Sequence, residues 1–115
     1  MSNMFYVPEI TVMNLTPHTV NIVTESGEII DYPASGVLAR VSARTQVIGK
    51  LGNIPITRTV YGEVEGLPEP EEGTIYIVSS LVAQRVPERT DVFVPSESVR
   101  DENGRIIGCR SLGRI

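Results

Sequence analysis

Apolar and polar residues alternate along the first third of the chain, a pattern typical of β-strands with one buried face. The alternation covers residues 9–15 and 19–24, and Ser26-Gly27 supplies a tight turn into a further extended segment at residues 28–32. The first two segments are separated by the turn residues Thr16, Pro17 and His18. We therefore predict three strands connected as a meander.

A longer hairpin is predicted in the middle of the chain. Residues 37–42 and 46–49 are strand segments separated by a polar interruption at Arg44-Thr45, and residues 50–53 form the hairpin tip. Residues 54–64 return as a long strand, in which Pro55 indicates an edge or a strand start. Five glutamates, two prolines and two glycines at residues 63–73 then predict an exposed acidic loop within one domain of residues 1–115.

The last third of the chain contains the one helix that we expect. Residues 74–78 form a compact apolar strand, and Ser79 or Ser80 then caps a short helix over residues 81–86. Pro87 ends this helix because proline cannot donate the backbone hydrogen bond that its continuation needs.

Two further segments complete the predicted fold. Residues 91–95 form a short strand, and residues 99–112 form a hairpin in which Asn103-Gly104 occupies the turn positions that need positive φ. The fold class is all-β and mainly antiparallel, as a small barrel or sandwich of about eight short strands with one short helix.

Composition supports a β-rich fold and limits the function classes. Val, Ile and Thr supply 36 of 115 residues, whereas Leu and Ala supply only 10, which excludes a helical bundle. No apolar run approaches the roughly 18 residues that span a bilayer. The first nine residues lack the features of a secretory signal, and Cys109 is the only cysteine. We therefore expect a cytoplasmic protein without disulfides.

Arginine dominates the basic residues: the chain has nine arginines, and Lys50 is the only lysine. Arginine can bind carboxylates or phosphates through paired donors, although a coding bias in a GC-rich genome explains the excess equally simply. The net charge of −4 argues against non-specific binding of nucleic-acid polymers. Any anion site is therefore expected to be local.

The first candidate anion site lies at the start of the predicted helix, where unpaired backbone N–H groups favour negative charge. Its candidate ligand-binding residues are Ser79, Ser80, Arg85 and Arg89. The alternative is a capped connector helix whose arginines are solvated or paired with Glu88 or Asp91.

The second candidate site is a turn of small residues followed by a strand. Its candidate ligand-binding residues are Ser35, Gly36, Arg40 and Arg44. Alternate residues of a strand share a face, so the two arginines are placed to converge on one anion. The alternative is an exposed strand whose arginines pair with Glu63 or Glu65 on the adjacent strand.

Enzyme chemistry receives little support from the sequence. His18 is the only histidine, so no His-containing cluster exists for a zinc site, and we expect a turn residue that hydrogen-bonds locally. Cys109 has apolar neighbours and is expected to be buried and inert. We therefore assign no catalytic residue, no metal ligand and no cofactor.

Several short patterns are distributed over most of the chain. They are Asn14 to His18, Ser35-Gly36 with Ala39 to Val41, Gly62 to Pro68, Gly73-Thr74, Pro87 with Arg89 and Asp91, and Val99 to Asp101 with Gly104. In these patterns the chain resembles a family of small uncharacterised bacteriophage and bacterial proteins, actinobacterial ones among them, for which no activity is established. The resemblance implies a phage-related origin and no mechanism.

Small phage proteins often act by binding. We therefore expect a non-catalytic homo-oligomer in the host cytoplasm that sequesters a phosphate-bearing, nucleotide-type signal of host defence. The alternative is a structural or protein-interaction module, either a minor virion component or an inhibitor of a host protein, with the sheet edge or the acidic loop as its contact. No membrane partner is expected.

Overall fold

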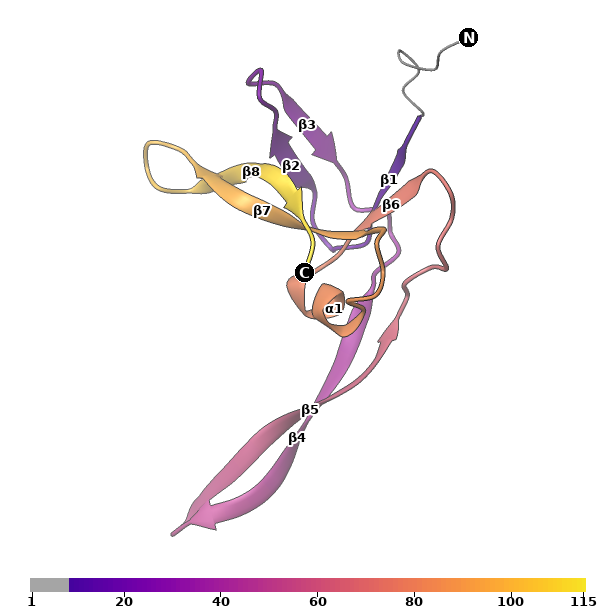
Figure 1. Cartoon of the computed structure of the whole chain (residues 1–115). Coiled ribbons are helices and arrows are strands. Elements are labelled where there is room, and N and C mark those ends of the chain that lie inside the picture. The colour runs from indigo at the N-terminus through magenta and orange to yellow at the C-terminus, as the bar shows by residue number, and fades with distance from the viewer. Residues whose placement is uncertain (1–8) are drawn as a thin grey trace.

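Eight strands and one short helix make up the fold in a computed structural model that describes residues 9–115 (Figure 1). The expected lack of a secretory signal concerns residues that lie almost wholly outside this range. The prediction of an all-β, mainly antiparallel fold with about eight strands and one helix is confirmed.

Six strands form one open sheet in the order β1-β6-β7-β8-β2-β3. Their bounds are Thr11–Asn14 (β1), Val20–Val23 (β2), Ile29–Tyr32 (β3), Thr74–Ile77 (β6), Val92–Arg100 (β7) and Ile106–Gly113 (β8). The β2–β3 and β7–β8 pairs are antiparallel, whereas β1–β6, β6–β7 and β2–β8 are parallel. The sheet is therefore mixed and does not close into a barrel.

The predicted three-strand meander is wrong, because β1 pairs with β6 and not with β2. Asn14, a buried polar residue at the end of β1, holds the chain where it leaves this strand. Its amide donates to the carbonyl oxygens of His18 (2.7 Å) and Tyr32 (2.8 Å), and its Oδ1 accepts from the backbone and hydroxyl of Thr16. These bonds satisfy the buried amide and hold the chain in a turn that leads away from β1.

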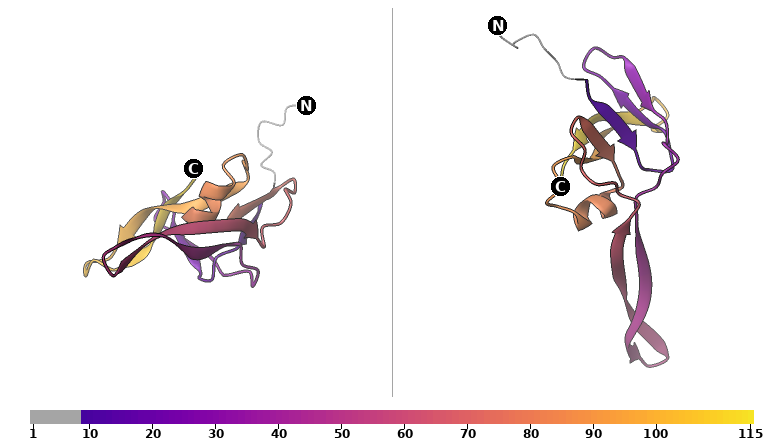
Figure 2. Two further views of the ribbon diagram at one scale, coloured as in Figure 1. Left: turned by 90° about the horizontal axis from the view of Figure 1, so that it is seen from below. Right: turned by 90° about the vertical axis from the view of Figure 1, so that its right-hand side faces the viewer.

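A two-stranded arm projects from this sheet (Figures 1 and 2). It consists of β4 (Arg40–Leu51) and β5 (Ile54–Glu65), each 12 residues long. The radius of gyration is 18.4 Å, against about 13 Å for a compact chain of this length. The arm accounts for this elongation, since it extends far beyond the sheet in both figures.

The predicted interruption of the first arm strand is also wrong. Arg44 pairs with Val60 and Thr45 with Thr59 in one continuous ladder, which is irregular only near Ser42 and Ile48. Both faces of the arm lie in solvent, so polar residues are tolerated on either face and the alternation of a half-buried strand disappears. The edge position predicted for Pro55 is confirmed, because both strands of a two-stranded arm are edges.

The core occupies both faces of the sheet around β6. Tyr76 and Val78 pack with Leu15 and Val82 on one face, and Ile77 packs with a second cluster on the other. This division follows from the alternation of side chains along a strand. The base of the arm joins the first cluster, and the second contains Cys109, whose predicted burial is confirmed.

The helix α1 (Ser80–Arg85) covers the first core cluster and is short, as predicted. Ser79 is its N-cap, with its Oγ accepting a hydrogen bond from the Val82 backbone (3.4 Å). Val86 caps the other end, immediately before Pro87. This settles the choice between Ser79 and Ser80 as the cap.

The β7–β8 hairpin turns where it was predicted, but by a different mechanism. Of the two turn residues only Gly104 has positive φ, and the Asp101 carboxylate closes the loop by accepting from the backbones of Asn103 (2.9 Å) and Arg105 (3.0 Å). The segment expected as a separate strand at residues 91–95 is the first part of β7, which continues to Arg100.

Gly66 lies where the arm returns to the sheet, and its substitution is expected to destabilise the fold. Its φ is +81°, and a Cβ would overlap the Leu38 carbonyl. Gly66→Ala should lower the free energy of unfolding by about 3 kcal/mol. Gly27→Ala is the control, since Gly27 has φ +88° and open space around it, and should cost about 1 kcal/mol. Equal losses in urea denaturation would contradict the close approach of residues 38 and 66.

Candidate functional site

The first candidate anion site is divided between different structural roles. Ser79 caps α1, and Ser80 is exposed at the first helical position. Arg85 ends the helix, whereas Arg89 follows a separate turn in which its N–H donates to the Val86 carbonyl (3.0 Å). The four residues are therefore not directed towards one ligand from a continuous helix.

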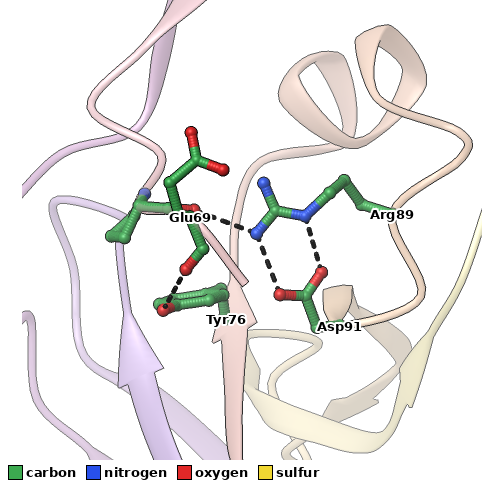
Figure 3. Close-up of polar contacts among 5 residues, drawn as sticks. Glu69, Tyr76, Arg89 and Asp91 are labelled. Atoms are coloured by element: carbon green, nitrogen blue, oxygen red, sulfur yellow. Dashed lines mark hydrogen bonds and ion pairs between the residues drawn. The ribbon is translucent and has the colours of Figure 1, made fainter. Parts of the chain in front are cut away.

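Arg89 forms a two-point ion pair with Asp91 (Figure 3). The distances are 2.8 Å from Nε to Oδ1 and 2.9 Å from Nη2 to Oδ2, and both side chains are only 16% exposed. This is the pairing with Asp91 that the sequence offered as an alternative to anion binding. Arg89 is consequently occupied by an internal carboxylate.

The same arginine attaches the acidic loop to the sheet. Its Nη2 donates to the Pro68 carbonyl (3.0 Å), and its guanidinium carbon lies 6.0 Å from the centre of the Tyr76 ring. The Tyr76 hydroxyl in turn donates to the Glu69 carbonyl (3.3 Å; Figure 3). We call Tyr76, Arg89 and Asp91 the loop clamp, because together they hold residues 68 and 69 against β6.

The ion pair within the loop clamp shifts the pKa values of both Arg89 and Asp91. The hydrogen bond from Arg89 lowers the pKa of the Asp91 carboxyl, and the reciprocal bond raises the pKa of Arg89. Because this pKa is lower in the folded than in the unfolded chain, the ion pair stabilises the fold fully at pH values above the ordinary carboxyl pKa of about 3.9. The stabilisation is lost as the pH falls from that value through the lower pKa of the folded state.

Asp91→Asn is expected to lower the free energy of unfolding by about 1–3 kcal/mol at pH 7, because Arg89 would lose its charged partner in a largely buried site. The difference from the wild type should shrink as the pH falls below about 3.9, because the unfolded chain then binds a proton at Asp91, and it should vanish once the folded carboxyl is protonated at its lower pKa. Urea denaturation at several pH values measures both effects. Glu88→Gln, in the same turn, is the control and should change little; an equal loss in the two variants would rule out the clamp.

The second candidate site lies where the chain enters the arm. Ser35 closes its own turn, its Oγ accepting from the Val37 N–H (3.2 Å), and Gly36 has φ +92°. Arg40 and Arg44 lie on one face of β4, as predicted, because no residue is inserted in β4 between them. Arg40 Nε lies 3.6 Å from Glu65 Oε2 in an exposed ion pair, which is the acidic-neighbour alternative.

Arg44 and Arg85, one from each candidate site, line two open grooves that share residues. An open groove of about 420 Å³ is lined by Arg44, and a second of about 340 Å³ is lined by Arg85. Both grooves include Tyr61 and Gly62, at the base of the arm. Neither arginine makes an ion pair within residues 9–115.

The outer part of the arm carries large apolar side chains in solvent, and the sequence did not single them out as a site. Leu51 is 67% and Ile54 63% exposed, and these two residues are cross-strand partners at the tip. The other members of this exposed set are Val47, Ile48 and Ile56. We call these five residues the apolar tip. The available signal was a cluster of large apolar residues on both sides of a predicted turn, which we interpreted only as strand.

Basic side chains lie on both faces of the arm, within or next to the apolar tip. Arg58 pairs across the arm with Gln46, whose Oε1 accepts from Arg58 Nε (3.2 Å), and the next pair on the same face is Arg44 with Val60. Lys50 pairs with Pro55 on the other face. The outer arm thus combines exposed apolar surface with positive charge.

The remaining candidates show no catalytic arrangement. His18 is exposed, and its backbone carbonyl accepts the bonds from Asn14 and Thr16. Among residues 9–115, no group of three His, Cys, Asp or Glu side chains is placed to hold a metal ion. No helix in the same range is long and apolar enough to cross a membrane.

No protein-family model matches the chain, and no curated protein or solved structure is significantly similar to it. The function therefore has to be argued from the geometry of the chain itself. Six of the 14 exposed large apolar side chains among residues 9–115 lie on the arm, and only Val41 and Val64 of the arm pack against the core.

Proposed function

We propose that this protein is a non-catalytic protein-interaction module and that the β4–β5 arm is its contact element. The observation that carries the proposal is the apolar tip, exposed on a projecting two-stranded element. Contiguous exposed apolar surface on a soluble domain marks an interaction site.

The arm contributes little to the stability of the fold. Only its base, through Val41 and Val64, packs against the core, so its outer part adds little to stability. Its strands also present unpaired edges, which soluble proteins usually shorten, charge or cover. Burying one Leu or Ile is worth about 1.5–3 kcal/mol, so covering the apolar tip would favour binding strongly.

The resemblance to phage proteins suggested two settings for such a module, a minor virion component or an inhibitor of a host protein. Both require a surface that recognises another protein. The sheet edge and the acidic loop were the contacts expected for this alternative. The arm takes their place in the proposal because the loop clamp holds the acidic loop against the sheet.

An arm-shortened variant tests the proposal. Arg44 and Val60 are cross-strand partners, so replacing residues 45–59 with Asn-Gly closes a short hairpin between them and leaves the core contacts intact. We expect the intact chain to bind another protein, whether a second copy or a partner captured from host lysate, and the variant to lose that binding. Indistinguishable capture of partners, together with the same oligomeric state for the two proteins, would contradict the proposal.

A nucleotide-type ligand is the second candidate. Tyr61 supports it, because this half-exposed ring lies between the grooves that Arg44 and Arg85 line, and a base can stack on an aromatic ring while arginines bind phosphate. Calorimetry with cyclic and linear nucleotides tests it. Binding that is lost in Tyr61→Ala would support this candidate, and no heat with any nucleotide would end it.

A further inference from the structure

Positive and negative charges are segregated along the chain. Residues 41–62, which make up nearly all of the arm, contain three basic residues and no acidic one. The rest of the chain contains the other seven basic residues and all 14 acidic ones, a net charge of −7. The arm is therefore a cationic and apolar element on an acidic body, and its complement is an acidic surface with apolar side chains.

The β2–β3 hairpin of the same chain has these properties. Residues 10–39 contain no Lys or Arg, and this hairpin contributes Glu25, Glu28 and Asp31. Ile29 is 57% and Ile30 40% exposed, between these acidic residues. In addition, β3 is the last strand of the sheet, so one side of it is free for strand addition.

We propose that the arm of one copy binds along the edge of β3 in a second copy. There the apolar tip meets Ile29 on one face of the hairpin and Ile30 on the other, with the arm cations beside the acidic residues. This inference rests on the proposed function and names its partner. The arm and the hairpin lie at opposite ends of the molecule, whose longest extent is 71 Å (Figure 1). The contact is head-to-tail and builds a closed ring or a filament.

Other surfaces of a second copy fit the arm less well. Two arms facing each other would bring together like charges from Arg44, Lys50 and Arg58. The acidic loop at residues 66–73 has charge but no strand and no large exposed apolar side chain. The opposite sheet edge, β1, has the sequence TVMN and no charge.

Zero-length carbodiimide cross-linking tests the inference, since it joins amines to carboxylates in direct contact and Lys50 is the only lysine. Copies labelled with ¹⁴N and ¹⁵N are mixed, cross-linked and digested. We expect mixed-isotope peptides that join Lys50 to Glu25, Glu28 or Asp31. Mixed peptides that join Lys50 to Glu69, Glu71 or Glu72, or no mixed peptide at all, would overturn the inference.

Charge reversal gives an independent test. Arg44→Glu with Arg58→Glu, and separately Glu28→Arg with Asp31→Arg, should each weaken self-association at least about tenfold, and mixing the two variants should restore it. Unchanged unfolding temperatures show that both variants are folded. Failure of the mixture to associate would overturn the inference. Arm-dependent binding of another protein would still leave the proposed function standing.

Discussion

Replacing Tyr76 with alanine is expected to lower the free energy of unfolding by about 3–5 kcal/mol, a large fraction of the roughly 5–15 kcal/mol typical of a domain. Tyr76 is 2% exposed and belongs to the main core cluster. Its loss opens a cavity beneath α1 and removes the ring on which the Arg89 guanidinium lies. Urea denaturation followed by circular dichroism measures the loss.

The matched control is Tyr76→Phe, which keeps the ring and removes only the hydroxyl that donates to Glu69. We expect it to lower the free energy of unfolding by about 0.5–1.5 kcal/mol, the net value of one hydrogen bond. Similar losses for the two variants would mean that the hydrogen bond to the acidic loop, and not packing of the ring, dominates this part of the fold.

The second large effect is expected at the arm and concerns association instead of stability. Leu51→Ser combined with Ile54→Ser should weaken the arm's binding at least about a hundredfold, because two exposed apolar side chains that become buried on binding contribute about 3 kcal/mol or more. The unfolding temperature should stay nearly constant, since both side chains are more than half exposed in the free chain. Sedimentation over a range of concentrations measures the association.

Ile115→Ser is the control for this pair, because Ile115 is 57% exposed but lies at the C-terminus, which is far from the outer end of the arm. It should leave association unchanged. If the control and the arm variant weaken association equally, general surface hydrophobicity and not the arm is responsible.

Local sequence patterns predicted most strands because alternation, turn residues and caps act over a few neighbouring residues. The alternation around Val20 and Ile22 and the Ser79 cap are examples. Strand order could not be derived in this way. The pairing of β1 with β6 joins residues about 60 positions apart, such as Thr11 and Thr74, and no local pattern specifies it.

The candidate sites were likewise predictable only where neighbouring residues or a paired strand determine the contact. Pairing of Arg40 with Glu65 and of Arg89 with Asp91 was foreseeable, because acidic residues lie on the adjacent strand and two positions along the chain. The exposure of the apolar tip was not. A run of apolar residues looks the same whether its strand is buried in a sheet or projects into solvent, and only the tertiary structure separates the two.

Light scattering of the intact chain and the arm-shortened variant tests most directly the central claim that the arm binds a second copy of this chain. The account predicts that the intact chain exceeds its monomer mass of 12.6 kDa increasingly with concentration, while the variant, folded by circular dichroism, stays at the mass of a monomer. Equal association of the two proteins, as the same multiple of their monomer masses at every concentration, would contradict it.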